Sequence, residues 1–415
     1  MQGAQYLTSD LTGAPQLTHE AGSLIAVLDA VLVNGWGLTT VDALTFDSST
    51  GQCTATFNSG HPFATDRIIT ITGSDQAAYN GEHRIEAKTS TTVVFTPATT
   101  PTANTATGAM SVKFSPLGWE RTFDDGAGTK ALYQPAAASR STNCGIMLDD
   151  TNTAQNYSYL SAYHALVRGV VNPHGIDDWD EQINDGDESS VSFGGWIRKT
   201  DGTSASDNRR WVVVGNDRFF YLIVKHQSSQ SYDSAVVYAF GEFESYRAGD
   251  EYNFFFMAGN CNYQSYNCTN DFGVFDGSGT ESRLIARGVD QQIGKSYTAF
   301  SFYRAGNLNY LPISATSSGA FLYPNPVNGE LVYSYPVELL ESKLNSFTAQ
   351  YTNLRGVLPG LCIPHHYKPL SADTVADILV EGVAARAAVL NVGYRSNQVQ
   401  SGQIFLLLNA GGWNG

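Results

Sequence analysis

The feature that most constrains this chain is the alternation of apolar and polar side chains between residues 61 and 97. Successive side chains of a β-strand point to opposite faces, so a period of two predicts strands that bury one face. The expected strands lie within 41–60, which holds two around a Ser-Ser-Thr-Gly turn, and within 67–73, 82–90 and 91–97. Asn80-Gly81 supplies two residues that tolerate positive φ between strands. These strands together predict a small barrel or curled sheet.

The composition extends this expectation to the whole chain. Forty glycines and an aromatic content of 12% favour strands and tight turns over long helices. Charged residues make up only 15% of the chain, against roughly 25% in an average soluble domain. A length of 415 residues exceeds what one hydrophobic core usually serves, so we expect a globular protein of two or three domains.

The run 219–226, "FFYLIVKH", is apolar on both faces. It predicts a central strand, covered on one side by a second sheet and on the other by a loop, a helix or a neighbouring subunit. The segment 384–392, "AARAAVLNV", has the composition of a short helix, but its glycine and β-branched neighbours favour a strand. We expect a β-sandwich for this larger part of the chain.

Residues 17–32 carry the best helical pattern, with apolar residues recurring at three and four. Thr18 can cap the N-terminus of this helix, Glu20 suits its dipole, and Gly35 follows its end. Leu24 and Leu28 lie on the apolar face and are candidate interaction residues. The small barrel, the later domain or another subunit could cover this face.

We therefore expect an all-β fold in three parts. They are an N-terminal arm and helix over 1–37, a small β-barrel over 38–115 and a jelly-roll-like β-sandwich over 116–415. A separate C-terminal subdomain from about residue 320 is an open alternative.

The net charge and the apolar runs exclude several classes of protein. A formal charge of -15, with no cluster of Lys and Arg, disfavours binding to nucleic acid. The sequence has no run of about 18 apolar residues for a transmembrane helix, and its N-terminus lacks the pattern of a signal peptide. We expect synthesis in a cytosol and no insertion into a membrane.

The cysteines and histidines give no metal signature. Cys261 and Cys268 form the only close cysteine pair, and a C-x6-C spacing is unusual for structural zinc. Free thiols in a reducing compartment are the favoured reading, with a disulfide formed after lysis as the alternative. His365 and His366 adjoin one another, with Cys362 nearby, but adjacent side chains on a strand rarely ligate one metal.

The densest acidic stretch is 174–190, and it supplies the hard oxygens that calcium prefers. The spacing does not fit an EF-hand loop, so a solvated loop is the favoured interpretation. If a calcium or magnesium ion binds there, its candidate ligands are Asp178, Asp180, Asp185 and Asp187. We expect no cofactor.

Two pairs of carboxylates are candidates for glycoside hydrolysis. They are Asp149-Asp150 and the pair Glu242 and Glu244. Residues at i and i+2 of a strand share a face, so Glu242 and Glu244 could lie together, whereas hydrolysis needs carboxyls roughly 5 to 10 Å apart in a cleft. Two charges on the outer face of a strand fit the same spacing. Nucleophile-elbow, phosphate-loop and zinc-protease motifs are absent from the sequence, so we expect no enzyme.

Aromatic residues are dense between Phe321 and Pro336. They could form a platform for sugar rings, a core or a subunit interface, where tyrosine is enriched for its large contact area. Tyr323, Tyr333 and Tyr335 are the candidate interaction residues of this stretch.

Three stretches carry a resemblance: Gly60–Phe63, 65–85 and 90–96. They resemble the small barrel of tailed-phage virion proteins, which is often related to the first catalytic-cysteine half-domain of ubiquitin-activating enzymes. The resemblance implies no activity, because no adenylation domain, ATP-binding glycine loop or active-site cysteine context accompanies it. Residues 11–37 and 116–135 also resemble the start of phage structural proteins, so the likeness covers about the first third of the chain.

This resemblance implies a non-enzymatic structural component of a tailed-phage virion, in the tail, baseplate or fibre-attachment region. A capsid decoration or minor capsid protein and a host-surface glycan-binding protein are the alternatives. The expected partners are other virion proteins and further copies of this chain in a symmetric assembly, with a host surface glycan as a further candidate. The expected location is the virion, assembled in the host bacterial cytoplasm.

Overall fold

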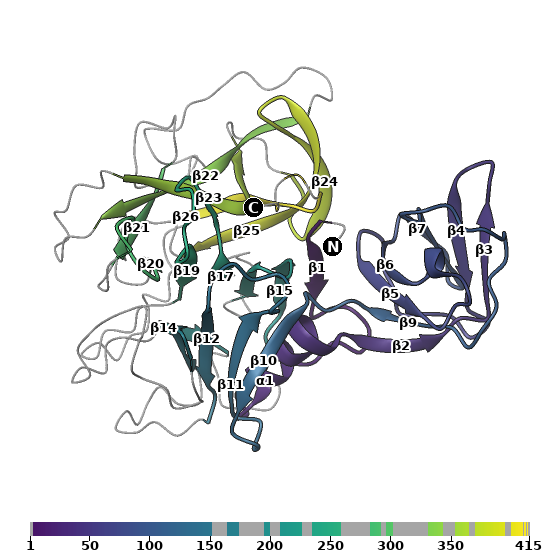
Figure 1. Cartoon of the computed structure of the whole chain (residues 1–415), viewed down its shortest axis with the longest axis horizontal. Coiled ribbons are helices and arrows are strands. Elements are labelled where there is room, and N and C mark those ends of the chain that lie inside the picture. The colour runs from purple at the N-terminus through teal and green to yellow at the C-terminus, as the bar shows by residue number, and fades with distance from the viewer. Residues whose placement is uncertain are drawn as a thin grey trace.

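A computed structural model describes most of the chain as antiparallel sheets (Figure 1). The described residues are 3–151, 164–173, 195–199, 208–225, 235–258, 283–291, 296–301, 331–342, 353–364, 370–394, 400–409, 411 and 413. Within these residues the strands pair antiparallel except for β22 (Val332–Ser342) and β24 (Thr374–Val380), which run parallel. The predicted all-β fold with a helix near the N-terminus is confirmed.

Residues 36–114 form two four-stranded sheets, which we call the small module. The first sheet has the order β2 (Trp36–Thr40), β9 (Ser111–Phe114), β5 (Ile68–Thr72), β6 (Gly81–Arg84). The second has the order β3 (Ala43–Asp47), β4 (Gln52–Thr56), β8 (Thr92–Phe95), β7 (Ala87–Lys88). Every second residue of β3, β4 and β8 is buried, as the alternation predicts. The module stands at one side of the molecule, away from the rest of the chain (Figure 1).

The connection between β5 and β6 differs from the prediction at Asn80. A short 3₁₀ helix, η2 (Ala77–Tyr79), precedes it, and Asn80 has an extended backbone with φ -79°. Its side chain accepts a bond from Ser74 N at 3.0 Å and donates one to Ser74 O at 2.9 Å. Of the two residues Asn80 and Gly81, Gly81 alone has positive φ, at 104°. Asn80 therefore stabilises this loop through its side chain, and the expected positive φ at Asn80 is wrong.

The N-terminal helix begins later than predicted. α1 (Ser23–Leu28) continues into a π-helix, η1 (Asp29–Asn34), and ends at Gly35 as expected. Gly22 takes the cap position with φ 76°, and the Thr18 hydroxyl instead accepts a bond from Glu20 N. The cap predicted at Thr18 is wrong because Asp150, distant in sequence, supplies the acceptor for the first turn.

A five-stranded sheet covers α1. Its order is β10 (Trp119–Asp124), β11 (Lys130–Pro135), β12 (Cys144–Asp149), β13 (His164–Val171), β14 (Gly195–Arg198). Leu24 and Leu28 are fully buried in one apolar core with residues of this sheet and of the small module. The apolar face of the helix is thus covered by its own chain, and a role for these two leucines in binding another subunit stays a prediction.

The remaining strands form a thirteen-stranded sheet. Its order is β1 (Gln5–Thr8), β15 (Trp211–Gly215), β16 (Phe219–Lys225), β17 (Ala235–Glu242), β19 (Phe254–Met257), β20 (Arg283–Ile285), β21 (Ser296–Ser301), β22, β24, β25 (Val383–Tyr394), β26 (Gln400–Leu407), β23 (Asn353–Pro364), β18 (Glu244–Ser245). We call this sheet, the five-stranded sheet and α1 the body. The segment 384–392 is part of β25, so the favoured strand is confirmed there. Because β1 pairs with β15, the N-terminal arm belongs to this sheet; the predicted domain boundaries stay predictions.

The central strand β16 separates two cores. Phe220, Leu222 and Val224 pack with α1, the five-stranded sheet and the small module. Phe219, Tyr221 and Ile223 pack with the C-terminal strands on the opposite face. Burying such a side chain stabilises a fold by about 1.5–3 kcal/mol. Both faces of this strand are therefore covered within one chain, and it needs no neighbouring subunit.

Candidate functional site

Glu242, one of the predicted catalytic candidates, lies at the end of β17 with 3% of its surface exposed. Gly241 precedes it with φ 130°, a conformation that side chains rarely adopt, and a Cβ there would lie 2.2 Å from Arg218 O. Glu244 belongs to the separate strand β18 and is exposed. The expected sharing of one face by Glu242 and Glu244 is wrong, because β17 ends at Glu242 and the alternation does not continue through Phe243.

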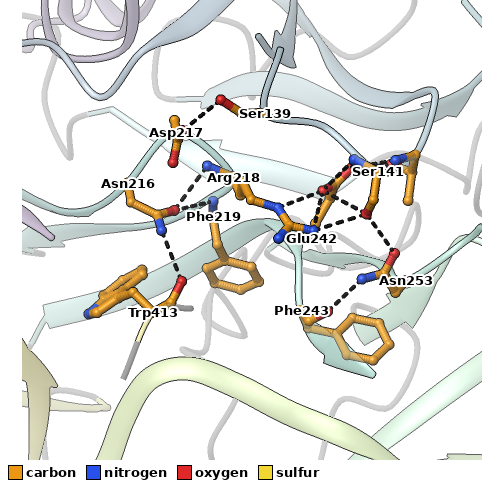
Figure 2. Close-up of polar contacts among 11 residues, drawn as sticks. Ser139, Ser141, Asn216, Asp217, Arg218, Phe219, Glu242, Phe243, Asn253 and Trp413 are labelled. Carbon is orange, nitrogen blue, oxygen red and sulfur yellow. Dashed lines mark hydrogen bonds and ion pairs between the residues drawn. The ribbon is translucent and has the colours of Figure 1, made fainter. Parts of the chain in front are cut away.

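Both carboxylate oxygens of Glu242 are held by donors from two other segments (Figure 2). Ser141 N donates to them at 2.8 and 2.9 Å and Thr142 N at 2.6 Å. The hydroxyls of Ser141 and Thr142 donate at 3.0 and 2.8 Å. Arg218 completes the set through Nε and Nη2, each at 2.9 Å. The carboxylate is therefore saturated by short bonds to its own chain.

The same network continues to the C-terminal residues (Figure 2). Asn216 Oδ1 accepts bonds from Arg218 N and Phe219 N, both at 2.9 Å, and its Nδ2 donates to Trp413 O at 3.2 Å. Ser139 Oγ donates to Asp217 at 2.6 Å. The network thus joins the loop before β12, the turn between β15 and β16, the end of β17 and Trp413. These bonds fix four distant segments against one another.

Asp150, the second catalytic candidate, is fully buried at the start of α1. Its carboxylate forms an ion pair with Lys199 and accepts a bond from Leu24 N at 2.9 Å. Lys199 Nζ also donates to Glu20 O at 2.9 Å. Burial raises the pKa of Asp150 to about 6, against the opposing effect of the Lys199 ammonium, and burial lowers the pKa of Lys199. Asp149 points elsewhere and pairs with Lys130 at 3.4 Å.

A third buried cluster was not predicted from the sequence. The Arg355 guanidinium lies 2.7 Å from Asp250 and 3.3 Å from Glu341. Glu341 Oε1 also accepts a bond from Val289 N at 2.8 Å. These residues come from four segments, the loop after β18, the loop after β20, β22 and β23, so no local pattern connects them. The same holds for Ser141 and Arg218 around Glu242, since nothing near either residue marks it as a partner.

Several predicted residues lie outside the described part of the chain. They are Asp178, Asp180, Asp185, Asp187, Cys261, Cys268, Tyr323, His365 and His366. Tyr333 and Tyr335 lie in β22, where their backbones pair with Leu379 and Ile363. Among the described residues, no group of three or more His, Cys, Asp or Glu side chains could hold a metal ion. Cys53, Cys144 and Cys362 are buried.

Within the described ranges, no helix has the length and apolar character needed to span a bilayer. The fold and its clusters define an all-β protein in which buried ion pairs connect segments distant in sequence. No protein-family model matches the chain, and no curated protein matches it. Among solved structures, it is similar to the phage phi92 endosialidase, with 10% identity over 90% of this chain and a TM-score of 0.16. The chain spans about half of that structure, 52% of its length.

Proposed function

We propose that this chain is a non-enzymatic structural component of a tailed-phage virion, in the tail, baseplate or fibre-attachment region. In this proposal the small module attaches the chain to neighbouring virion proteins, and the body is displayed or packs against other copies. The chain is assembled into the particle in the host bacterial cytoplasm. The observation that carries the proposal is that all three stretches of the phage resemblance between residues 60 and 96 fall in the small module, which stands off from the body (Figure 1).

The buried carboxylates support a structural role. A general acid or nucleophile needs an oxygen that can reach a substrate. The oxygens of Glu242 are held by Ser141, Thr142 and Arg218, and those of Asp150 by Lys199 and Leu24 N. In this proposal these two carboxylates position segments of the fold.

A homo-oligomer in a symmetric assembly is part of the proposal. Because both faces of β16 are covered within the chain, the contacts between copies would use other surfaces. The dense aromatic stretch from Phe321 to Pro336 is the first place to test, by substituting Tyr333 and Tyr335 and measuring the mass of the assembly.

The test is to locate the chain in purified particles of a phage that encodes it. Gold-labelled antibody against the body should decorate the tail or baseplate, and a density map of the particle should contain the small module there. Label on the head shell would replace this placement with a capsid decoration or minor capsid protein. Absence from particles, together with binding of the full chain to host glycans on an array, would favour the glycan-binding alternative.

A further inference from the structure

The small module joins the body at a narrow apolar base. The chain enters the module through Gly35, with φ 67°, and leaves it through Gly118, with φ 94°. Beside these crossings the Trp36 ring lies 5.1 Å from Phe114 and 6.3 Å from Trp211, centroid to centroid. A Cβ at Gly35 would lie 2.1 Å from Phe114 O, so the crossing requires glycine. This base holds the module by packing, which restricts its direction weakly.

A second set of contacts, entirely polar, connects the module to both ends of the described chain. Arg84, at the end of β6, donates through Nη2 to Ala4 O at 2.7 Å and to Leu408 O at 2.9 Å. Its Nη1 donates to Asp66 O at 2.8 Å. Ala4 N in turn donates to Leu408 O at 3.1 Å. One guanidinium of the module therefore binds the N-terminal and C-terminal strands at once.

Asp66 is also bound by an arginine of the body. Arg386, on β25, places Nε and Nη2 at 3.0 and 3.1 Å from the two carboxylate oxygens of Asp66. Such a two-point pairing fixes direction as well as distance. Asp66 itself has φ 64°, in the left-handed region that Asp adopts more readily than most side chains.

Gln5, on β1, makes further bonds to the module and its base. Its Nε2 donates to Ile68 O at 2.7 Å and to Ser115 O at 2.9 Å, while its Oε1 accepts a bond from Ile68 N at 2.9 Å. The residue is fully buried. We call Gln5, Asp66, Arg84 and Arg386 the junction clamp.

We propose that the junction clamp sets the direction in which the small module points, and that its release lets the module turn about the base at residues 34–37 and 115–118. Apolar packing at the base has no directional preference, whereas the hydrogen bonds and the two-point ion pair of the clamp have fixed geometry, so the clamp decides the direction. The inference goes beyond the proposed function and does not depend on it, because it concerns the isolated chain.

The test measures the distance between the module and the body. Ser48, at the exposed tip of the module, and Ala127, on the exposed turn between β10 and β11, would each carry a nitroxide on a non-natural ketone side chain. This labelling leaves the cysteines unchanged. Pulsed electron-spin resonance then gives the distribution of distances for the wild-type chain and for the Arg84→Met/Arg386→Gln variant.

We expect one narrow distribution for the wild type and a distribution at least twice as wide, or with a second maximum, for the double variant. The control Arg210→Gln removes the exposed ion pair with Asp10 inside the body and should leave the width unchanged. An unchanged width in the double variant, with a cooperative thermal transition, overturns the proposal. Should the double variant fail to fold, the same distance distribution is measured for Arg386→Gln alone. Arg386 is 40% exposed, so its substitution should be tolerated. An unchanged width in that single variant would also overturn the proposal.

Discussion

The small module and the body solve the problem of burying polar groups in different ways. In the module the core is mostly apolar, and it includes the His83 side chain, which is 2% exposed and has its ring centroid 4.2 Å from that of Phe95. In the body, charged side chains are buried in pairs and clusters around Glu242, Asp150 and Arg355. Local alternation suffices to specify the module, whereas the body depends on specific partners far apart in the sequence.

The largest effect should come from removing one partner of the Glu242 network. Glu242→Ala leaves Arg218 and the N–H groups of Ser141 and Thr142 without their acceptor. Breaking a buried pair in this way costs about 3–5 kcal/mol, so the free energy of unfolding in urea should fall by that amount. Glu244→Ala, at an exposed position two residues on, should change it by less than about 0.5 kcal/mol. An equal loss of unfolding free energy in Glu242→Ala and Glu244→Ala would show that the buried network does not stabilise the body.

A smaller effect is expected at the start of α1. Asp150→Ala removes the acceptor of the bond from Leu24 N together with the partner of the buried Lys199 ammonium, and leaving a buried polar group unsatisfied costs about 1–3 kcal/mol. We expect the free energy of unfolding to fall within this range. Adding Lys199→Met should restore part of it, because the buried ammonium is then gone. Asp149→Ala is the matched control, and a loss there as large as that of Asp150→Ala would contradict the role assigned to Asp150.

The two regions should also respond to acid with opposite signs. Burial lowers the pKa of His83, so the folded module binds fewer protons than the unfolded chain and loses stability as the pH falls below about 6.5. The pKa of Asp150 is raised to about 6, so its contribution increases as the pH falls through 6 and is lost as the pH rises through that value. Hydrogen exchange at pH 7 and pH 5, corrected for intrinsic rates, should show reduced protection in residues 68–95. His83→Leu should abolish that reduction; its persistence would assign the effect to another group.

The smallest effect is expected at Leu38 on β2, which is 74% exposed. Leu38→Ser should change the free energy of unfolding by less than about 0.5 kcal/mol. Leu44→Ala, in the core of the same module, should lower it by about 2–5 kcal/mol. Thermal melts of the two variants give this comparison, and a large loss for Leu38→Ser would show that this side chain is covered in solution.

The sequence predicts those parts of the fold that depend on neighbouring residues. Alternation places β4 and β8, and two-sided apolar character identifies β16 as central. Prediction fails where a distant residue decides the local structure. Asp150 moves the start of α1, and the turn at Gly241 separates Glu242 from Glu244. Neither effect leaves a signal within the few residues that a local pattern covers.

The partners of the donors around Glu242 could not be predicted for the same reason. Ser141, Arg218 and Glu242 are separated by 77 and 24 positions, and each is an ordinary polar residue in its own segment. Only the paired sheets bring them together.

The pairing of the chain's first strand with its later ones has a consequence for the order of folding. During synthesis β1 can pair with β15 only after residues 211–215 have been made. The bond from Ala4 N to Leu408 O can form only after residue 408 has been made. The strands of the small module pair only with one another, within residues 36–114, so these pairings can form while the ribosome is still making the body. The contacts that fix the orientation of the module therefore form last, when Leu408 and its neighbours reach Ala4 and Arg84.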